Sequence, residues 1–169
     1  MTVREVLQLG NPVLRERSAR VEDFSEIHRL QEDLGDTLSH WRRTTGYGRG
    51  IAAPQIGVLK RVVFINIDRP WLLVNPSITW MSHERMMVWD ACLSYLCMFF
   101  QVSRARKIKV RYQDDNGREK EVVAEGTLSE LLQHEIDHLD GILAIDRVSD
   151  VRTICTREEY EKRYAPKSV

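Results

Sequence analysis

The stretch LLQHEIDHLDG (131–141) combines a helical pattern with two histidines four positions apart. In and around it, apolar residues recur every three or four positions, which is typical of a helix with one buried face. The members of this stripe are Leu128, Leu131, Leu132, Ile136 and Leu139. Thr127, followed three residues later by Glu130, predicts a capping box at the start, and Gly141 predicts the end. We expect this helix to lie at the centre of the fold.

His134 and His138 project from one face of this helix at adjacent turns, as two imidazoles must to share one metal ion. Glu135 directly follows the first histidine in the HExxH pattern, which suits a general base acting on metal-bound water. The competing interpretation is an ordinary solvated helix face that carries two histidines. A catalytic metal also requires a third protein ligand and an open position for water.

The residue pattern does not yet identify the third protein ligand. Candidates outside the helix are the carboxylates and four soft or borderline donors: Cys92, Cys97, Cys155 and His83. A thiolate with two imidazoles is a ligand mix known for zinc and iron(II). Cys92 ends an apolar, strand-like run in WDACLSY, but spacing alone does not choose between Cys92 and Cys97. A free cysteine is otherwise most often a small buried hydrophobe.

The segment FSEIHRLQEDLGDTLSHWRRTTG (24–46) predicts a long helix near the N-terminus. Ser25 is its expected N-cap and Gly46 its expected stop, whereas His28 and His40 are expected to be solvated. Its apolar stripe consists of Ile27, Leu30, Leu34, Leu38 and Trp41.

Short β-rich runs follow at 61–67, 71–80 and 85–94, after a glycine-punctuated loop at 46–58. Residues 107–126 predict a hairpin in which Asn116-Gly117 forms a two-residue type I′ turn. The tail predicts a short helix capped by Thr156 with Glu159. The expected fold class is α+β: short, mostly antiparallel strands packed around a central metal-binding helix, with a long helix near the N-terminus, in one domain over 1–169.

Composition limits the partners. The formal net charge is zero, which gives no sign of stable nucleic-acid binding. No apolar run reaches the roughly 18 residues of a membrane span, and MTVREVLQLG lacks the apolar core of a signal peptide. Three cysteines without a framework spacing indicate reduced thiols, so we expect a cytoplasmic protein.

Three motifs resemble those of the peptide deformylases. They are GRGIAAPQIG (48–57), DACLS (90–94) and QHEIDHLDG (133–141), in the order and at the approximate separations of that family. RARKIKVRYQDDNG, between the second and third motifs, is also similar, so the resemblance covers nearly the whole length.

The resemblance implies a metal-dependent hydrolase that removes the N-formyl group, typically from formyl-methionine, of nascent peptides during protein biosynthesis and releases formate. The implied metal ligands are Cys92, His134 and His138. A water fills the fourth position, and Glu135 takes a proton from it and later gives one to the leaving amine. The implied ion is iron(II), which zinc or nickel replaces on handling. We further expect transient contact with the ribosome surface.

The remaining implied roles concern the oxyanion and the substrate. Gln55 and the backbone N–H of Leu93 are expected to hold the oxyanion. Gly48 and Gly50 would let the loop backbone approach an extended peptide. The full set of expected substrate-binding residues is Gly48, Arg49, Gly50, Ile51, Val88, Glu130 and Leu131.

Several positions depart from the family. Asp90-Ala91 replaces its Glu-Gly, and the glutamate typically pairs with an arginine for which Arg104 stands at the matching place. Asp90 is one methylene shorter, so this support is expected to be looser or rearranged. Phe99 falls near a substrate-contacting arginine of some members, and it forms either an apolar wall with Phe100 or part of the core.

Arg49 and Glu130 stand where the family more often has apolar residues around the pocket for the methionine side chain. They are either solvated charges or neighbours of that pocket that make it smaller or more polar. Formyl-methionine would then be a poorer substrate.

Two other functions compete with hydrolysis of formyl groups. One is a deformylase-like protein that binds peptides with little or no turnover, and the other is a metallopeptidase that cuts internal bonds. The complete ligand set with Glu135 and Gln55 disfavours the first, because a binding module needs no general base. The cysteine ligand and the short chain disfavour the second.

Overall fold

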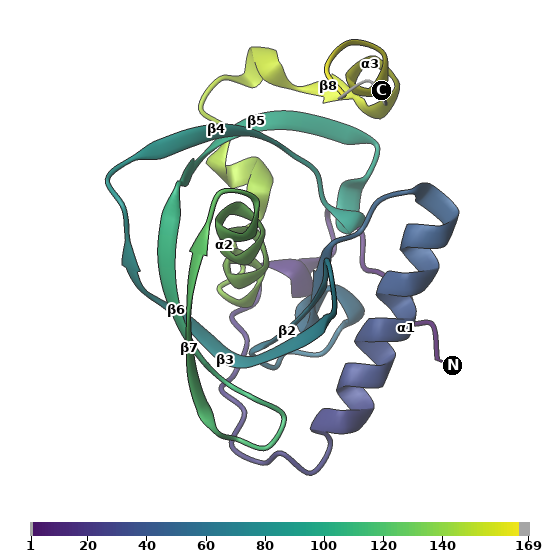
Figure 1. Cartoon of the computed structure of the whole chain (residues 1–169). Coiled ribbons are helices and arrows are strands. Elements are labelled where there is room, and N and C mark those ends of the chain that lie inside the picture. Colours follow the sequence, from purple (N-terminus) through teal and green to yellow (C-terminus); the bar gives the residue numbers. More distant parts are fainter. Residues whose placement is uncertain (1, 166–169) are drawn as a thin grey trace.

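The structure, a computed structural model, describes residues 2–165. Helix α2 (Thr127–Leu139) lies at the centre with strands on both sides of it, and α1 (Ile27–Thr45) runs along one flank (Figure 1). The prediction of an α+β fold with mostly antiparallel strands around a central helix is therefore confirmed, as is the long helix near the N-terminus.

One sheet has five strands in the order β1-β2-β3-β6-β7, all of whose pairings are antiparallel. Its strands are β1 (Gly50–Ala52), β2 (Val62–Asn66), β3 (Pro70–Met81), β6 (Lys107–Gln113) and β7 (Glu119–Glu125). β3 is long and bends through register shifts against β6, which lets the sheet curve around α2.

The second sheet has the order β4-β5-β8 and lies across the other side of α2 (Figure 1). Its strands are β4 (Arg85–Asp90), β5 (Met98–Ala105) and β8 (Cys155–Thr156), and a short helix α3 (Arg157–Arg163) follows β8. Single 3₁₀ turns connect these elements at Pro12–Arg15, Ala53–Ile56, Leu93–Tyr95, Ala144–Arg147 and Val151–Thr153. Cys92 follows β4, on the side of α2 that the second sheet covers (Figure 1).

α2 is buried along most of its length, with polar as well as apolar side chains covered. Its apolar stripe packs on the five-stranded sheet against residues such as Val63, Leu73 and Val110. α1 packs separately, with Leu34 and Leu38 inside a second cluster that covers the opposite side of that sheet. Removal of this apolar surface from water stabilises the fold by about 25 cal/mol for each Å² that is buried.

A polar clamp fixes α2 to β5. The side-chain amide of Gln133 accepts from Ala105 N at 3.0 Å and donates to Ala105 O at 2.9 Å. Ser129, one turn earlier, donates its hydroxyl to the same carbonyl at 2.8 Å. Because all of these groups are buried, each would be costly to leave unpaired, so the clamp sets the depth and rotation of the helix.

Two of the predicted helix starts are wrong. α2 begins after Gly126, whose backbone turns the chain with φ +59°, and the carboxylate of Glu130 bonds Arg49 instead of the helix end. α1 has Glu26 at its N-cap position without a side-chain cap, because Ser25 bonds to Asp23. In both cases a tertiary or turn partner competes for the expected capping group.

The other predicted ends are confirmed. Gly46 closes α1 with φ +78°, and Thr156 Oγ accepts from Glu159 N at the start of α3. Gly141 follows α2 with φ +71°, and a Cβ there would lie 2.3 Å from Arg15 O. Only glycine suits this position, because it needs both the left-handed backbone and the close approach.

The hairpin joining β6 and β7 exists, but its turn is not the expected two-residue type I′. Five residues, 114–118, link the strands, and only Gly117 has a positive φ. Asp114 instead organises the loop, since its carboxylate accepts from the N–H groups of Asn116 and Arg118. An Asx-type turn thus replaces the turn that Asn116-Gly117 suggested.

Three strands escaped the sequence analysis: β1, β5 and the two-residue β8. β1 lies within the segment expected to be a loop, and it pairs with β2 so that Ile51 faces Phe64. β5 contains aromatic, charged and small residues without strict alternation, because both of its faces are covered and even Arg104 is buried on it. Burial on both faces removes the period-2 signal on which strand prediction depends.

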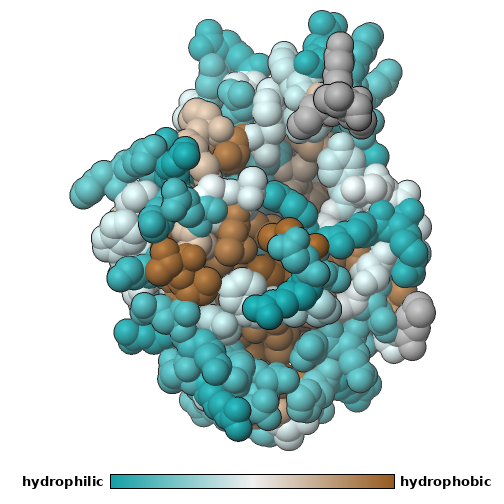
Figure 2. All heavy atoms as spheres, in the orientation of Figure 1, coloured by the Kyte–Doolittle hydropathy of each residue, from teal (hydrophilic) through white to brown (hydrophobic). Residues whose placement is uncertain are grey.

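On the face drawn in Figure 2, hydrophilic residues form most of the periphery, and apolar residues gather over the middle, where Figure 1 shows α2 between the sheets. Among the described residues, no helix combines the length and apolar character needed to cross a membrane.

Replacing Gln133 with alanine tests the clamp. Gln133→Ala leaves the buried N–H of Ala105 without its side-chain acceptor and removes one of the two side-chain donors to Ala105 O, so the free energy of unfolding should fall by about 2–3 kcal/mol. Urea unfolding of the two proteins measures this difference. Gln31→Ala on the flank of α1 is the matched control and should stay within about 0.5 kcal/mol of the parent. Equal losses in both variants would contradict the clamp.

Candidate metal centre and substrate cavity

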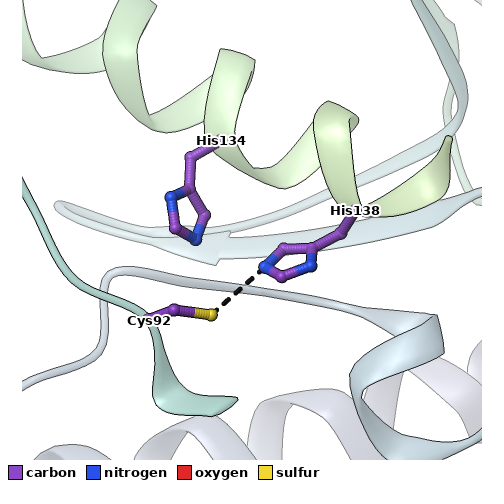
Figure 3. A group of neighbouring side chains, drawn as sticks. All are labelled: Cys92, His134 and His138. Carbon is purple, nitrogen blue, oxygen red and sulfur yellow. Dashed lines mark hydrogen bonds between the residues drawn. The ribbon is translucent and has the colours of Figure 1, made fainter. Parts of the chain in front are cut away.

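Three buried donors from two elements converge between α2 and the second sheet. His134 and His138 project from adjacent turns of α2 toward Cys92, which follows β4 (Figure 3). One ligand atom from each lies within 4.8 Å of the other two, and Cys92 Sγ lies 3.2 Å from His138 Nε2. One thiolate and two imidazoles at this spacing fit a single divalent ion of the zinc or iron(II) type.

Asp90 holds the first histidine in place. Its Oδ1 lies 2.8 Å from His134 Nδ1, and its Oδ2 lies 3.1 Å from Arg104 Nη2. Arg104 also contacts Asp137 on α2 with its other terminal nitrogen, at 2.5 Å. The shorter side chain therefore still pairs with Arg104, and it reaches His134 as well. With Nδ1 committed to Asp90, Nε2 of His134 is left to bind an ion.

The pKa values of the two histidines shift in opposite directions. Burial alone would lower the pKa of His134, but the charge of Asp90 and its hydrogen bond outweigh burial and raise that pKa well above its usual value. Burial lowers the pKa of His138 well below its usual value, so it is neutral, the form that ligates metals. Burial opposes ionisation of Asp90 too, yet His134 and Arg104 keep its pKa below the usual range.

Gln55 reaches the same point from the 3₁₀ turn after β1. Its Oε1 accepts from Ala52 N at 2.9 Å, which directs Nε2 toward Cys92 Sγ at 3.3 Å and Ser94 Oγ at 3.2 Å. The amide is buried, so this network fixes its orientation. Leu93 begins the 3₁₀ turn after Cys92, a position whose N–H has no acceptor within the turn. The side-chain N–H of Gln55 and the backbone N–H of Leu93 thus lie next to the three candidate metal ligands.

Glu135 lies beside the ligands with part of its carboxylate unpaired. Its Oε2 is buried and has no hydrogen-bond partner within the described chain. Burial raises the pKa of Glu135 to about 7, against the opposing charge of His134. A buried carboxyl that binds a proton near neutral pH, beside a donor set for a metal, has the properties of a general base.

A cavity of about 240 Å³ opens onto these groups. Five expected substrate-binding residues line it: Gly48, Arg49, Gly50, Glu130 and Leu131. Ile51 and Val88 are not among its lining residues. Ile51 is fully buried in the cluster around α1, and Val88, which is half-buried, packs beside the cluster that contains Phe100.

An aromatic wall, formed by Tyr47, Phe99 and Tyr160, closes another side of the cavity. The rings of Phe99 and Tyr160 stack with centroids 4.1 Å apart, and Tyr47 meets Phe99 edge-on at 5.4 Å. Phe99 therefore lines the cavity, whereas Phe100 is core. Sequence reasoning missed Tyr160, because α3 is far from the motifs along the chain and reaches the cavity only through the pairing of β8 with β5.

The other expected candidates lie apart from this centre. Cys97 is exposed and Cys155 lies in β8, and neither belongs to a potential metal-binding group among residues 2–165. His83 and His28 are exposed. The spacing that left Cys92 and Cys97 equivalent is thus resolved by the turn at Leu93–Tyr95, which sends Cys97 to the surface.

A buried Cys/His/His donor set with an adjacent glutamate and an amide donor defines the class of mononuclear metallohydrolases. The model of the polypeptide deformylase family matches residues 3–153. Peptide deformylase of Bartonella tribocorum is 36% identical over 177 residues, which cover 99% of this chain and 97% of the relative. That of Caldanaerobacter subterraneus is 39% identical over 150 residues, covering 88% and 91%.

Solved structures agree. Peptide deformylase from Thermotoga maritima superposes with a TM-score of 0.83 at 34% identity, covering 89% of this chain and 100% of the other. The enzyme from Synechococcus elongatus, solved with actinonin, gives 0.83 at 32% identity, covering 94% and 85%. The chain belongs to the peptide deformylase family, metalloenzymes that remove the N-formyl group from nascent peptides.

Gly50 provides a test of how the glutamate is placed. A Cβ at Gly50 would lie 2.6 Å from Glu135 Oε1, so Gly50→Ala must displace that carboxylate. Misplacement of a catalytic group costs about 10²-fold in turnover, so Gly50→Ala should lose about this factor. Its metal content should stay unchanged. Formate release and metal analysis measure both quantities.

Gly35→Ala is the matched control for Gly50→Ala. Gly35 lies in α1, where a Cβ would meet only the Phe64 ring at 3.3 Å, away from the cavity. Equal activity of the two alanine variants would contradict the steric argument.

Proposed function

We propose that this chain, acting as one catalytic domain over residues 1–169, hydrolyses the N-formyl group of peptide substrates and releases formate. The observation that carries the proposal is the buried group of Cys92, His134 and His138, beside a cavity that Cys92, His134 and Glu135 line. The ion we propose is iron(II), with zinc or nickel as substitutes, since the donor set suits each of them. Such an ion, when bound, supplies a Lewis acid and lowers the pKa of water.

Glu135 is the proton carrier of the proposed reaction. Its carboxylate accepts a proton from the attacking water and then gives it to the nitrogen of the leaving amine. The unpaired Oε2 supports this role, because a free oxygen in a closed site is available to that proton. Gly50, directly against Glu135, leaves room for the carboxylate to serve both steps.

Gln55 and Leu93 are the proposed donors to the developing oxyanion. Gln55 Nε2 lies 3.3 Å from Cys92 Sγ, and Leu93 directly follows that ligand, which supports placing both N–H groups beside the formyl oxygen. A pre-oriented donor of this kind contributes about 3–4 kcal/mol to transition-state stabilisation in acyl-transfer enzymes. Gly48 and Gly50 border the cavity where the peptide backbone would enter.

Binding of peptides without turnover is the less favoured alternative. A binding module gains nothing from burying an unpaired carboxylate, which costs about 1–3 kcal/mol or more. Phe99 and Asp90, the departures that favour that alternative, leave the donor set and Glu135 in place. We further propose action in the cytoplasm on emerging chains, with transient contact at the ribosome surface.

Removal of single thiols tests the ligand assignment. Cys92→Ala should lower affinity for a divalent ion at least about 100-fold, because loss of even an outer partner of a ligand costs 10–100-fold. Cys97→Ala, at an exposed thiol of the same loop region, should bind the ion as the parent does. Competition with a chromophoric chelator measures both affinities. The reverse result would move the third ligand to Cys97.

Removal of the base tests the reaction. Glu135→Ala should keep its metal and lose about 10²–10⁴-fold in formate release, the usual contribution of a positioned general base. The assay uses iron(II)-loaded protein prepared without oxygen, because oxidation of the Cys92 thiolate would remove a ligand. Undiminished turnover by metal-loaded Glu135→Ala protein would refute the assignment.

A further inference from the structure

A half-buried ion pair lines the cavity close to the reacting groups. Arg49 contacts Glu130, and both residues line the same cavity as Cys92 and Glu135. Glu130 lies one helical turn before His134 on α2, and Arg49 precedes Gly50, which touches Glu135. The pair therefore lies next to the residues that are proposed to act on the formyl group.

The two partners differ in exposure. The Glu130 side chain is 7% exposed and the Arg49 side chain is 46% exposed, so the pair is closed behind the carboxylate and open at the guanidinium. The first side chain of a bound peptide can end in a closed recess. The peptide backbone continues beyond the cavity, so it must leave by an open side. Tyr47, Phe99 and Tyr160 of the aromatic wall line the same cavity.

The chemistry of this recess is polar but close to neutral overall. Arg49 has five N–H donors, more than one contact with a carboxylate consumes, and the carboxylate of Glu130 has lone pairs beyond the one that Arg49 uses. An apolar side chain placed here would remove water from both groups without replacing its hydrogen bonds, which is unfavourable. A full charge of either sign would meet one like-charged partner.

From this geometry we infer that the Arg49–Glu130 pair selects substrates whose first residue has a neutral, hydrogen-bonding side chain. A carboxamide is the best match, because its carbonyl oxygen accepts from Arg49 and its NH₂ group donates to Glu130. Formyl-methionine, whose thioether is only a weak acceptor, is then a poorer substrate than a formyl peptide that begins with a carboxamide side chain. This inference rests on the proposed function for its activity assay, but substrate binding tests it independently.

The experiment compares formyl peptides that differ only in the first residue: glutamine, methionine, norleucine, glutamate and lysine. The kcat/KM for formate release is measured with iron(II)-loaded protein. Binding of the same peptides to metal-loaded Glu135→Ala protein is measured by calorimetry. We expect glutamine to exceed norleucine and methionine by about 10-fold or more in both measurements, since a recess built for hydrogen bonds rejects analogues that lack them.

Arg49→Ile/Glu130→Leu removes both charges together, so neither charge is left without its partner. It should reverse the preference, so that norleucine exceeds glutamine. Lys107→Gln/Glu125→Gln is the matched control. It removes a 3.4 Å ion pair outside the cavity and should keep the ranking of the parent.

Glu130→Gln keeps the shape of the pair and is the second variant, should the double variant not fold. It leaves Arg49 without a compensating charge, so glutamate at the first position should gain about 10-fold relative to glutamine. A ranking that neither variant changes would overturn the inference, as would a parent that favours methionine, norleucine, glutamate or lysine.

The two failures are distinguishable. If no formyl peptide releases formate but calorimetry still ranks glutamine first, the proposed function fails and the selectivity of the pair stands. If formate is released with methionine preferred, the function stands and the selectivity fails. A shift in first-residue preference caused by Tyr160→Ala alone would place the first side chain on the aromatic wall instead, and would also overturn the inference.

Discussion

The carboxylate of Asp90 is the interaction on which the rest of the centre depends. It connects three elements, because it ends β4, receives Arg104 from β5 and contacts His134 on α2. An isolated buried carboxylate would be costly, but two donors compensate it, and Arg104 is in turn shared with Asp137. The orientation of the first histidine, the position of the Cys92 loop and the docking of α2 are thereby set together.

We propose that the cavity divides into a catalytic end, whose residues match the family motifs, and a recognition end, whose residues depart from them. At the catalytic end, the donor set, Glu135 and Gln55 meet with partners that fix their orientation. At the recognition end, the Arg49–Glu130 pair and the aromatic wall with Tyr160 replace groups that the motifs alone would suggest. In the proposed account, chemistry and side-chain selection reside on different residues, so one can change while the other is retained.

Much of this arrangement could be predicted from the sequence, because local periodicity fixed both long helices and ordered motifs located the donors. The errors arise where distant partners intervene. Glu130 caps no helix, since Arg49 from another element binds its carboxylate. β5 has no alternating pattern because both faces are covered, and Tyr160 reaches the cavity only through a two-residue strand. Such contacts depend on tertiary packing, which a single sequence does not encode locally.

Metal affinity of Asp90 variants tests the central claim most directly. His134 and Arg104 each use one carboxylate oxygen of Asp90, and the side chain of asparagine has only one acceptor oxygen. Asp90→Asn should therefore bind a divalent ion about 10–100-fold more weakly than the parent. Asp90→Glu restores two acceptors and should recover most of the affinity. If Asp90→Asn binds the ion as tightly as the parent, the carboxylate does not organise the centre and the account is wrong.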